Sequence, residues 1–526
     1  MGEEGNKNSG SVAVGQYKRV FHQPENPFAS LIPDQSIALI PSFTLESGVT
    51  LYNVPLAYTA RGRLSPNKDN VMVICHALTG SADVSDWWGP LLGGAGRAFD
   101  LTRFFVVCMN SLGSPYGSAS PVTNMDGNPA NGIYGPEFPL TTIRDDVNFH
   151  KLLLDDLGIR QVAVVIGGSM GGMLALEWAY FGIDYVRAVV PIATSSRHSA
   201  WGISWGEAQR QSIYSDPKYG KRCSRHAIRL DGKPVNSFQP PTTGLGAARM
   251  SALLTYRSRN SFESRFGRKI PDPSKRQSIN DSRQSDPTEE HWAIHNEGHK
   301  NAVSSRSSIR SSVFSYQNGS ATNSTASIQE NTSTANGSLD YVDPQFSSAR
   351  DSAVPSPAST RSSSHSKRAP TYFSAQSYLR YQGEKFVKRF DSNCYIAITR
   401  KLDTHDVSRS RSLPDSPKPI ADALSLIKQP ALVMGIQSDG LFTYGEQEEL
   451  AAGIPDARLR NIDSPEGHDA FLLQFEQVNR YILEFLREVL PDVMNAVVDT
   501  EGEEGVGKLL KSSTFGEAEV EDITAW

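Results

Sequence analysis

Short, continuously apolar runs alternate with amphipathic stretches along most of this chain. The runs Val71–Cys75 and Phe104–Met109 are apolar throughout, as expected of strands that are buried on both faces of a parallel sheet. From Thr142 to Gly158 apolar residues recur at helical spacing, with Thr142 and Asp145 able to cap the start and Gly158 able to end the helix. The pattern therefore predicts strands that alternate with helices.

The alternation continues to near the C-terminus. Further strands are predicted at Val162–Ile166, Val186–Ala193, Pro430–Ile436 and Ala457–Asp463, and further helices at Glu446–Ile454 and Ala470–Leu490. Repeated β-α-β units give a mostly parallel sheet with helices on both faces, so the expected fold class is α/β.

Two segments interrupt this pattern. From about Pro271 to Pro370 Ser, Asn and Thr dominate and large apolar residues are sparse. Such a segment cannot bury enough surface to offset its ordering entropy, so we predict a long disordered insert. Its Ser and Arg content would permit phosphorylation, although no motif shows it. A shorter loop of similar composition is expected at Ser408–Pro419.

Composition and charge exclude several classes of function. Of the 526 residues 38% are hydrophobic and 21% charged, which indicates a soluble globular chain long enough for more than one domain. The net charge of −5 and the lack of a basic stripe argue against a nucleic-acid partner. Four scattered cysteines without a Cys-x-x-Cys pair argue against a metal site or a disulfide framework.

The N-terminus, "MGEEGNKNSG", has neither the basic nor the apolar segment of a signal peptide, and it is too acidic for a mitochondrial presequence. Asn6 stands where a myristoylation motif has Ser or Thr. No apolar run is long enough to span a membrane. We therefore expect a cytoplasmic protein with no membrane partner.

The stretch "VVIGGSMGGMLALEW", Val164–Trp178, sets one serine among four glycines between a predicted strand and a helix. Gly167 to Gly171 fits the G-x-S-x-G pattern of a nucleophile elbow, a sharp turn that exposes the serine hydroxyl at the end of a sheet. The pattern also occurs by chance in passive glycine-rich turns, but the flanking strand and helix favour a catalytic Ser169. A phosphate-binding loop is disfavoured because no Gly-Lys-Ser/Thr follows.

A nucleophilic serine needs a base and an orienting acid, which this kind of fold supplies in the order Ser, Asp or Glu, His. Asp439 follows the predicted late strand, and His468 lies in the loop before the last helix. We therefore predict Ser169, Asp439 and His468 as the catalytic residues. The oxyanion would be held by the backbone N–H groups of Met170 and, by position in the loop after the first core strand, of Leu78.

Other residues compete for these roles. His405 is the serious rival to His468, but it precedes the late strand, and His76 is better placed to shape the oxyanion loop. Asp463 and Glu466 lie too close in sequence to His468 to orient it from the expected strand end.

Several long blocks are more diagnostic than the five-residue motif. They include "HALTGSADVSDWW", "YGPEFPLTTIRDDV", "GGSMGGMLALEW", "GLGAARMSALLTYRS", "SYLRYQGEKFVKRFDSNCYIAITRKLDTHD" and "EGHDAFLL". These blocks span most of the chain from about Thr44 to Val489, apart from the Ser-rich insert, and they resemble the homoserine O-acetyltransferases of methionine biosynthesis, especially the fungal enzymes.

The resemblance implies an α/β-hydrolase fold with a helical cap. It divides the chain into an N-terminal extension (1–43), a first part of the core (44–200), a helical cap that contains the insert at about 271–370 (201–406), a second part of the core (407–490) and an acidic C-terminal tail (491–526). It also implies a homodimer that acts on small-molecule substrates.

The activity that the resemblance implies is a ping-pong acyl transfer without a bound cofactor. Ser169 would take an acetyl group from the co-substrate acetyl-CoA and pass it to the side-chain hydroxyl of L-homoserine, with His468 as base and acid and Asp439 holding its tautomer. By position, Arg249 matches the family arginine that pairs with the substrate carboxylate, and Asp469 matches the residue that receives the amino group. Without the family, Arg249 would be interpreted as a helix-surface arginine and Asp469 as a charge that complements a helix dipole.

Alternative functions stay open at this point. A related O-acyltransferase would use serine, a succinyl donor or the hydroxyl of deacetylcephalosporin C. An esterase-type hydrolase differs only in that water reaches the acyl-enzyme, so the motifs do not separate it. A catalytically dead binding protein on the same fold is disfavoured because Ser169, Asp439 and His468 are all present.

Overall fold

The structure is a computed structural model that describes residues 15–219, 240–270, 291–292, 294–296, 298–299 and 372–496. Contacts divide the chain into two units, Met1–Lys275 with Phe373–Trp526, and Arg276–Tyr372. The predicted insert at about 271–370 lies outside the described residues, but for a few between 291 and 299, and so does most of the predicted acidic tail. The elements described below belong to the first unit.

A nine-stranded sheet runs through this unit in the order β1-β2-β3-β7-β4-β8-β9-β10-β11. Strands β1, β2, β3 and β7 pair antiparallel in succession, and from β7 to β11 all pairs are parallel. The bounds are β1 (Lys18–Val20), β2 (Ser36–Thr44), β3 (Thr50–Arg61), β4 (Val71–Cys75), β7 (Phe105–Met109), β8 (Val162–Gly168), β9 (Val189–Ile192), β10 (Ala431–Gly435) and β11 (Ala457–Asn461), while β5 (Leu92–Gly93) and β6 (Phe99–Asp100) form a separate pair. The predicted α/β class with a mostly parallel sheet is confirmed.

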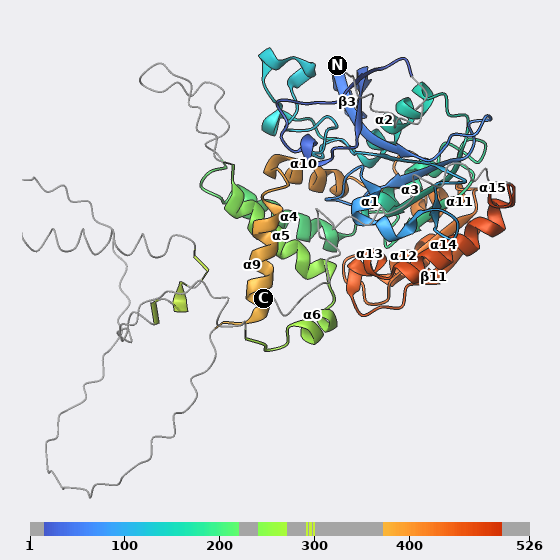
Figure 1. The fold of residues 1–526 in the computed structure, drawn as a ribbon. Helices are drawn as coiled ribbons and strands as arrows, with labels where there is room; N and C mark the ends of the chain where they lie inside the picture. The colour runs from blue at the N-terminus through green and yellow to red at the C-terminus, as the bar shows by residue number, and fades with distance from the viewer. Residues whose placement is uncertain are drawn as a thin grey trace, which may run out of the picture. The chain divides into compact units, whose positions relative to one another are not determined.

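Both faces of the sheet are buried, as the continuous apolar runs predicted. In β4, Val71 and Val73 join one hydrophobic cluster, and Met72 and Ile74 join another on the opposite face. The first cluster includes residues of α2 (Ile143–Asp156), α3 (Met170–Ala179), α11 (Pro419–Ser425) and α12 (Tyr444–Gly453), and the second includes residues of α1 (Val84–Trp87), α13 (Ala470–Leu473) and α14 (Phe475–Val489) (Figure 1). Helices therefore cover the sheet on both sides.

The predicted start of α2 is confirmed at the level of hydrogen bonds. The Asp145 N–H donates to Thr142 Oγ1 over 3.0 Å, and the Thr142 N–H donates to Asp145 Oδ2 over 2.8 Å. This reciprocal capping box satisfies two backbone donors at the helix start. Gly158 follows the helix with a φ of 71°, a conformation that favours glycine.

Two parts of the fold differ from the prediction. Strands β1 to β3 were not predicted, because Pro41 in β2 and Pro55 in β3 interrupt sequences that also carry polar residues. The predicted closing helix is broken at Gln474, whose φ of −92° and ψ of 53° are not helical, so that α13 and α14 are separate. The Gln474 side chain donates to Ser464 Oγ over 3.2 Å, which ties the break to the loop that precedes α13.

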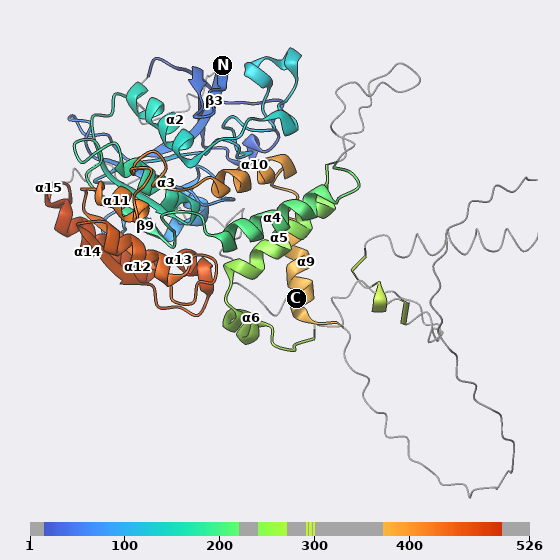
Figure 2. The ribbon, with the colours of Figure 1, turned by 180° about the vertical axis from the view of Figure 1, so that it is seen from behind.

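The stretch between β9 and α11 contains the helices α4 (Ala200–Tyr214), α5 (Thr242–Tyr256), α6 (Arg259–Arg265), α9 (Ser374–Phe386) and α10 (Ser392–Asp403). Helix α5 packs against α4 and α9, and both views show these three helices together (Figures 1 and 2). A Cβ added to Gly383 would lie 3.0 Å from the Gly246 carbonyl oxygen, so glycine in α9 permits the close approach to α5. Apart from Ala200, the first residue of α4, these helices fall within residues 201–406, where the sequence predicts the cap.

Candidate active site

Ser169 stands at a tight turn between β8 and α3. Its φ of 58° and ψ of −122° are unusual for a residue with a side chain, and this strain is typical of functional turns. Gly171 is required because an added Cβ would lie 2.1 Å from the Cys75 carbonyl oxygen of the neighbouring β4. The predicted strand–turn–helix context of the motif is thus present in the structure.

The three residues predicted as catalytic lie in one hydrogen-bonded line. His468 Nε2 is 2.9 Å from Ser169 Oγ, and His468 Nδ1 is 2.6 Å from Asp439 Oδ2. Asp439 follows β10, and His468 lies in the short 3₁₀ helix η8 (Gly467–Asp469), so the sheet end brings together segments that are far apart in sequence. All three side chains are buried, with Ser169 8% exposed.

The surroundings of His468 favour a strong base. Burial lowers the pKa of His468, but the Asp439 carboxylate, assisted by Asp469, outweighs this effect and raises the pKa above its ordinary value. Asp439 itself is fixed because its Oδ1 accepts the backbone N–H groups of Leu441 and Phe442 over 2.8 and 3.0 Å. This arrangement can deprotonate a serine hydroxyl and then protonate a leaving group.

A cavity of about 40 Å³ opens beside Ser169. Leu78 lines it from the core, and Met170 follows Ser169 as the first residue of α3. Within the described part of the chain, the backbone N–H groups of Leu78 and Met170 have no hydrogen bond. Both are therefore open to an oxyanion. Helices α4, α5 and α10 contribute further lining residues: Gly202, Trp205, Gly206 and Gln209 of α4, Thr255 and Tyr256 of α5, and Thr399 and Leu402 of α10.

Arg249 and Asp469 are both buried, at 3% and 7% exposure. The Arg249 guanidinium carbon lies 5.0 Å from the ring centre of Phe386 and 5.4 Å from that of Tyr256, so the helix-surface interpretation of this arginine is wrong. Asp469 pairs with Arg257, whose Nε lies 2.9 Å from Asp469 Oδ2. Neither Arg249 nor Asp469 is among the residues that line the small cavity.

The rival residues lie elsewhere. The His405 ring bonds to the Ser195 carbonyl oxygen over 3.0 Å, and Asp463 is held by Gln477 through its backbone. Glu466 accepts hydrogen bonds from Arg257 and Arg265 over 2.7 and 2.6 Å. None of the three has a hydrogen bond to Ser169 or His468 within the described residues.

Sequence reasoning missed Arg257 and His198. Arg257 follows α5 and bridges Glu466, just before the η8 turn, and Asp469, the last residue of that turn, so it secures the segment that carries His468. A signal was present: two acidic residues beside a buried histidine require a cation. His198 lines the cavity with its ring 5.8 Å from Phe442, and burial lowers the pKa of His198 to about 4.

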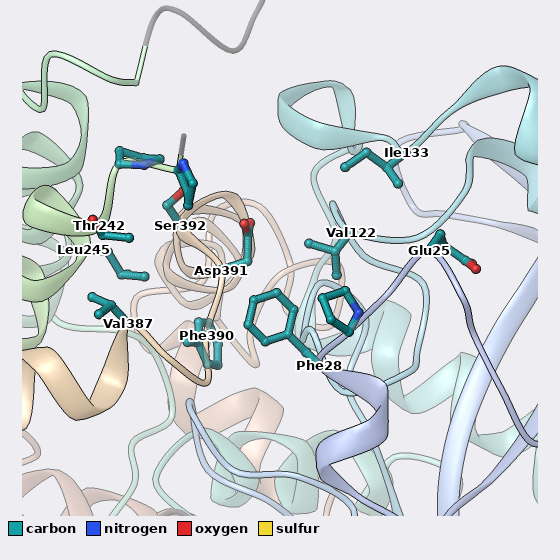
Figure 3. Close-up of a pocket in the computed structure, with 13 residues that line it drawn as sticks. Glu25, Phe28, Val122, Ile133, Thr242, Leu245, Val387, Phe390, Asp391 and Ser392 are labelled. Carbon is teal, nitrogen blue, oxygen red and sulfur yellow. The ribbon is translucent and has the colours of Figure 1, made fainter. Parts of the chain in front are cut away.

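A larger cavity of about 400 Å³ lies away from Ser169 (Figure 3). Glu25, Phe28 and Val122 line one side of it, and Leu245 of α5 and Phe390, between α9 and α10, line the other. This cavity is therefore separate from the predicted catalytic residues.

Among the residues that the structure describes, no group of three or more His, Cys, Asp or Glu side chains is arranged to hold a metal ion. Within the same residues, no helix has both the length and the apolar character needed to cross a membrane.

Comparison with known proteins agrees with the fold and the geometry of the site. Residues 70–475 match the family model of the α/β hydrolase fold. The chain is 67% identical over 515 residues to the homoserine O-acetyltransferase of Emericella nidulans, covering 98% of this chain and 99% of the relative. It is 52% identical over 508 residues to the enzyme of that name from Schizosaccharomyces pombe, covering 96% of each chain. The chain thus belongs to the homoserine O-acetyltransferases, a group of acyltransferases on the α/β-hydrolase fold, as the sequence blocks predicted.

Solved structures share the fold at low sequence identity. The homoserine O-acetyltransferase of Bacillus anthracis superposes with a TM-score of 0.59 at 18% identity, covering 86% of this chain and 97% of that one. Esterase E22 superposes with a TM-score of 0.57 at 20% identity, covering 86% and 99%. Since a transferase and an esterase fit equally well, the fold does not choose the acceptor.

Proposed function

We propose that this protein transfers an acetyl group from acetyl-CoA to the side-chain hydroxyl of L-homoserine through an acetyl-Ser169 intermediate, giving CoA and O-acetyl-L-homoserine. The observation that carries the proposal is the line Ser169–His468–Asp439, with separations of 2.9 and 2.6 Å, at a strained turn. Membership of the homoserine O-acetyltransferases supports the choice of acyl donor and acceptor.

In the first half-reaction, His468 Nε2 removes the proton of Ser169 Oγ as the oxygen attacks the thioester carbonyl carbon. The carbonyl oxygen becomes an oxyanion that the Leu78 and Met170 N–H groups stabilise. The tetrahedral intermediate collapses when its C–S bond breaks, and His468 returns the proton to the CoA thiolate. Asp439 holds the imidazole and stabilises its charged form while the proton resides there.

The second half-reaction repeats these steps with the acceptor. His468 deprotonates the homoserine hydroxyl, which attacks the acetyl carbon, and then returns the proton to Ser169 as the ester bond to the enzyme breaks. Arg249 would bind the carboxylate of the acceptor, and Asp469 its ammonium group. Opposite charges that fix the two ends of a zwitterion would favour homoserine over water.

The direct test incubates the protein with acetyl-CoA or succinyl-CoA and homoserine, serine or no acceptor, and follows both CoA release and the acylated product by mass spectrometry. We expect acetyl-CoA with homoserine to give the fastest CoA release and O-acetylhomoserine in equal amount. Free acetate at the same rate with and without homoserine would instead establish an esterase-type hydrolase. Preference for serine or succinyl-CoA would establish one of the related acyltransferases.

The proposal also includes a cytoplasmic homodimer, for which the family resemblance is the support. Light scattering on the purified protein should give about twice the mass of one chain, and a monomer mass would contradict it. Imaging of a fluorescent fusion would test the compartment.

A further inference from the structure

Both ring nitrogens of His76, which follows β4, are engaged. The Ser111 backbone N–H lies 3.0 Å from His76 Nε2, and a backbone N–H can only donate, so Nε2 accepts. In the neutral ring the proton therefore resides on Nδ1, which lies 2.8 Å from the Ala77 carbonyl oxygen and donates to it. His76 is 1% exposed, and burial lowers the pKa of His76 to about 4, which keeps the ring neutral near pH 7.

This bond fixes a peptide that matters for catalysis. The Ala77 carbonyl and the Leu78 N–H belong to one planar trans peptide, so they point in opposite directions. His76 Nδ1 and the Gly80 N–H, which is 3.0 Å away, both hold the Ala77 oxygen. The Leu78 N–H is thereby directed away from His76, and Leu78 is the residue through which this loop reaches the cavity of Ser169.

A buried ion pair holds the backbone segment whose N–H donates to Nε2 of His76. Leu112, next to Ser111, donates its N–H to Asp146 Oδ1 over 2.8 Å and accepts Lys401 Nζ at its carbonyl over 2.7 Å. Asp146 of α2 and Lys401 of α10 are 2.5 Å apart and both fully buried. The backbone segment 111–112 is thus clamped from two helices, and the N–H that orients His76 has a fixed position.

We propose that His76 is a positioning residue for the oxyanion hole, which orients the Leu78 N–H through the Ala77 carbonyl, and that the Asp146–Lys401 pair holds the segment against which His76 is set. The inference rests on the proposed acyl transfer at Ser169. Its consequence is selective: a misdirected N–H weakens binding of the transition state and leaves binding of the substrates unchanged.

Two substitutions separate the contacts of His76. In His76→Asn the amide nitrogen occupies the place of Nδ1 and can still donate to Ala77, but nothing accepts from Ser111. In His76→Gln the amide oxygen reaches the place of Nε2 and can accept from Ser111, but the donor to Ala77 is lost. Both replace a buried ring by a smaller amide, so packing is disturbed to a similar degree.

The experiment measures the rate of Ser169 acetylation by rapid quench, steady-state kcat and KM for both substrates, and the melting temperature. We expect His76→Gln to lower the acetylation rate and kcat by about 10- to 100-fold with little change in either KM, since loss of one oxyanion donor costs about 10²- to 10³-fold in kcat. His76→Asn should keep the acetylation rate within about fivefold of wild type, because it retains the hydrogen-bond donor to the Ala77 carbonyl oxygen. If His76 had a merely structural role, retaining this donor would not matter.

The ion pair is tested by the double substitution Asp146→Asn with Lys401→Met, which leaves no unpaired buried charge. It should lower kcat by no more than the roughly fivefold expected of His76→Asn, without raising KM, and its effect should be less than additive with that of His76→Asn, since both disturb the contact with the Ser111 N–H. Full additivity would overturn the role of the pair.

The outcomes distinguish the inference from the proposed function. If the wild-type protein forms no acetyl-Ser169, the proposed function fails and the inference fails with it. If the wild type is acetylated and His76→Gln is acetylated equally fast, only the inference is overturned. Equal rate losses in His76→Asn and His76→Gln would mean that His76 acts by packing alone, which also overturns it.

Discussion

The side chain of Ser169 is placed by backbone strain rather than by packing. Its positive φ directs Oγ toward His468, while Gly171 lets α3 approach β4. A hydroxyl contributes little volume, so its removal should leave the turn intact. The chemistry of this residue can therefore be tested apart from the fold.

Ser169→Ala should lower CoA release from acetyl-CoA by about 10⁴-fold or more, because no nucleophile then remains on the line to His468. The melting temperature should stay within a few degrees of wild type. Turnover is measured with a thiol reagent and stability by calorimetry. Near-wild-type turnover in the alanine variant would rule out Ser169 as the nucleophile.

Asp439→Asn should lower kcat/KM by about 10⁴-fold, as expected when the imidazole loses its orienting carboxylate. The acyl transfer needs neutral His468, so the rate rises with pH through the pKa of this histidine. Because Asp439 raises that pKa, the acidic limb of the profile should move to lower pH in the variant. An acidic limb that does not move would show that His468 is not the group that titrates.

Arg249→Ala should slow acetyl transfer to homoserine strongly while leaving acetylation of Ser169 largely intact, because only the acceptor carries a carboxylate that needs this cation. Rapid quench separates the two half-reactions. Arg259→Ala is the matched control, since Arg259 is exposed on α6 of the same helical region. A lost acetylation burst in Arg249→Ala would place Arg249 on the CoA side, and an unchanged transfer rate would remove it from the site.

The sequence predicts Ser169, Asp439 and His468 because their order and their positions at strand ends follow from the fold alone. It does not predict that Arg257 pairs with Asp469, since that contact depends on how α5 meets the η8 turn. The tautomer of His76 also needs the structure, because it is set by the Ser111 N–H from another loop.

At the scale of elements, the η8 turn that carries His468 is held by α6 and by the residues that connect α5 to α6. Glu466, just before the turn, accepts bonds from Arg257 Nη1, Arg265 Nη2 and Ser261 Oγ. Gly467 has a φ of 76°, and an added Cβ there would lie 2.4 Å from the Ser258 nitrogen. The turn therefore sits directly against the α5–α6 connection.

Arg257→Met should destabilise the fold by about 3 kcal/mol, the usual cost of leaving buried carboxylates without their cation. The Arg257 and Asp469 side chains are 5% and 9% exposed, whereas Arg265, at 16%, forms an ion pair with Glu466 but none with Asp469 among the residues that the structure describes. Arg265→Met is thus the control and should cost about 1 kcal/mol. Urea unfolding measures both, and equal losses would show that the Asp469 contact contributes nothing.

Helices and strands are predictable from the local sequence where their residues are uniformly buried, and the prediction fails where buried and exposed residues are mixed. Strand β4 matches its predicted bounds because every residue in Val71–Cys75 is buried. Strand β3 has two exposed residues, Tyr52 and Asn53, before a buried run that Pro55 interrupts, and a local pattern does not reveal that it pairs with β2. The break at Gln474 likewise depends on its contact with Ser464.

At the scale of the whole molecule, the site needs both the core and the helices inserted between β9 and β10. Leu78, Ser169 and Phe442 come from loops at the sheet, whereas Trp205 and Tyr256 come from α4 and α5. Such a cavity closes around a small acceptor only if these helices stay in place. The Ser-rich segment that interrupts this region is therefore the test of which parts of the chain the site requires.

Deleting about Ser274–Lys367 should leave kcat within about threefold and the melting temperature within a few degrees of wild type. The Ser374 N–H donates to the Lys269 carbonyl over 2.9 Å, so the ends of the described chain already meet and a short remaining loop can join them. Shortening a flexible loop of about 100 residues to about ten removes roughly 2 kcal/mol of closure entropy, which favours the deletion variant if anything. Steady-state kinetics and calorimetry on the purified variant check this, with full-length protein prepared alongside. A large loss of activity at unchanged stability would mean that the segment acts at the site. Loss of both activity and stability would mean that the segment holds α6 and α9 together. Either result would contradict the composition-based prediction of a dispensable insert.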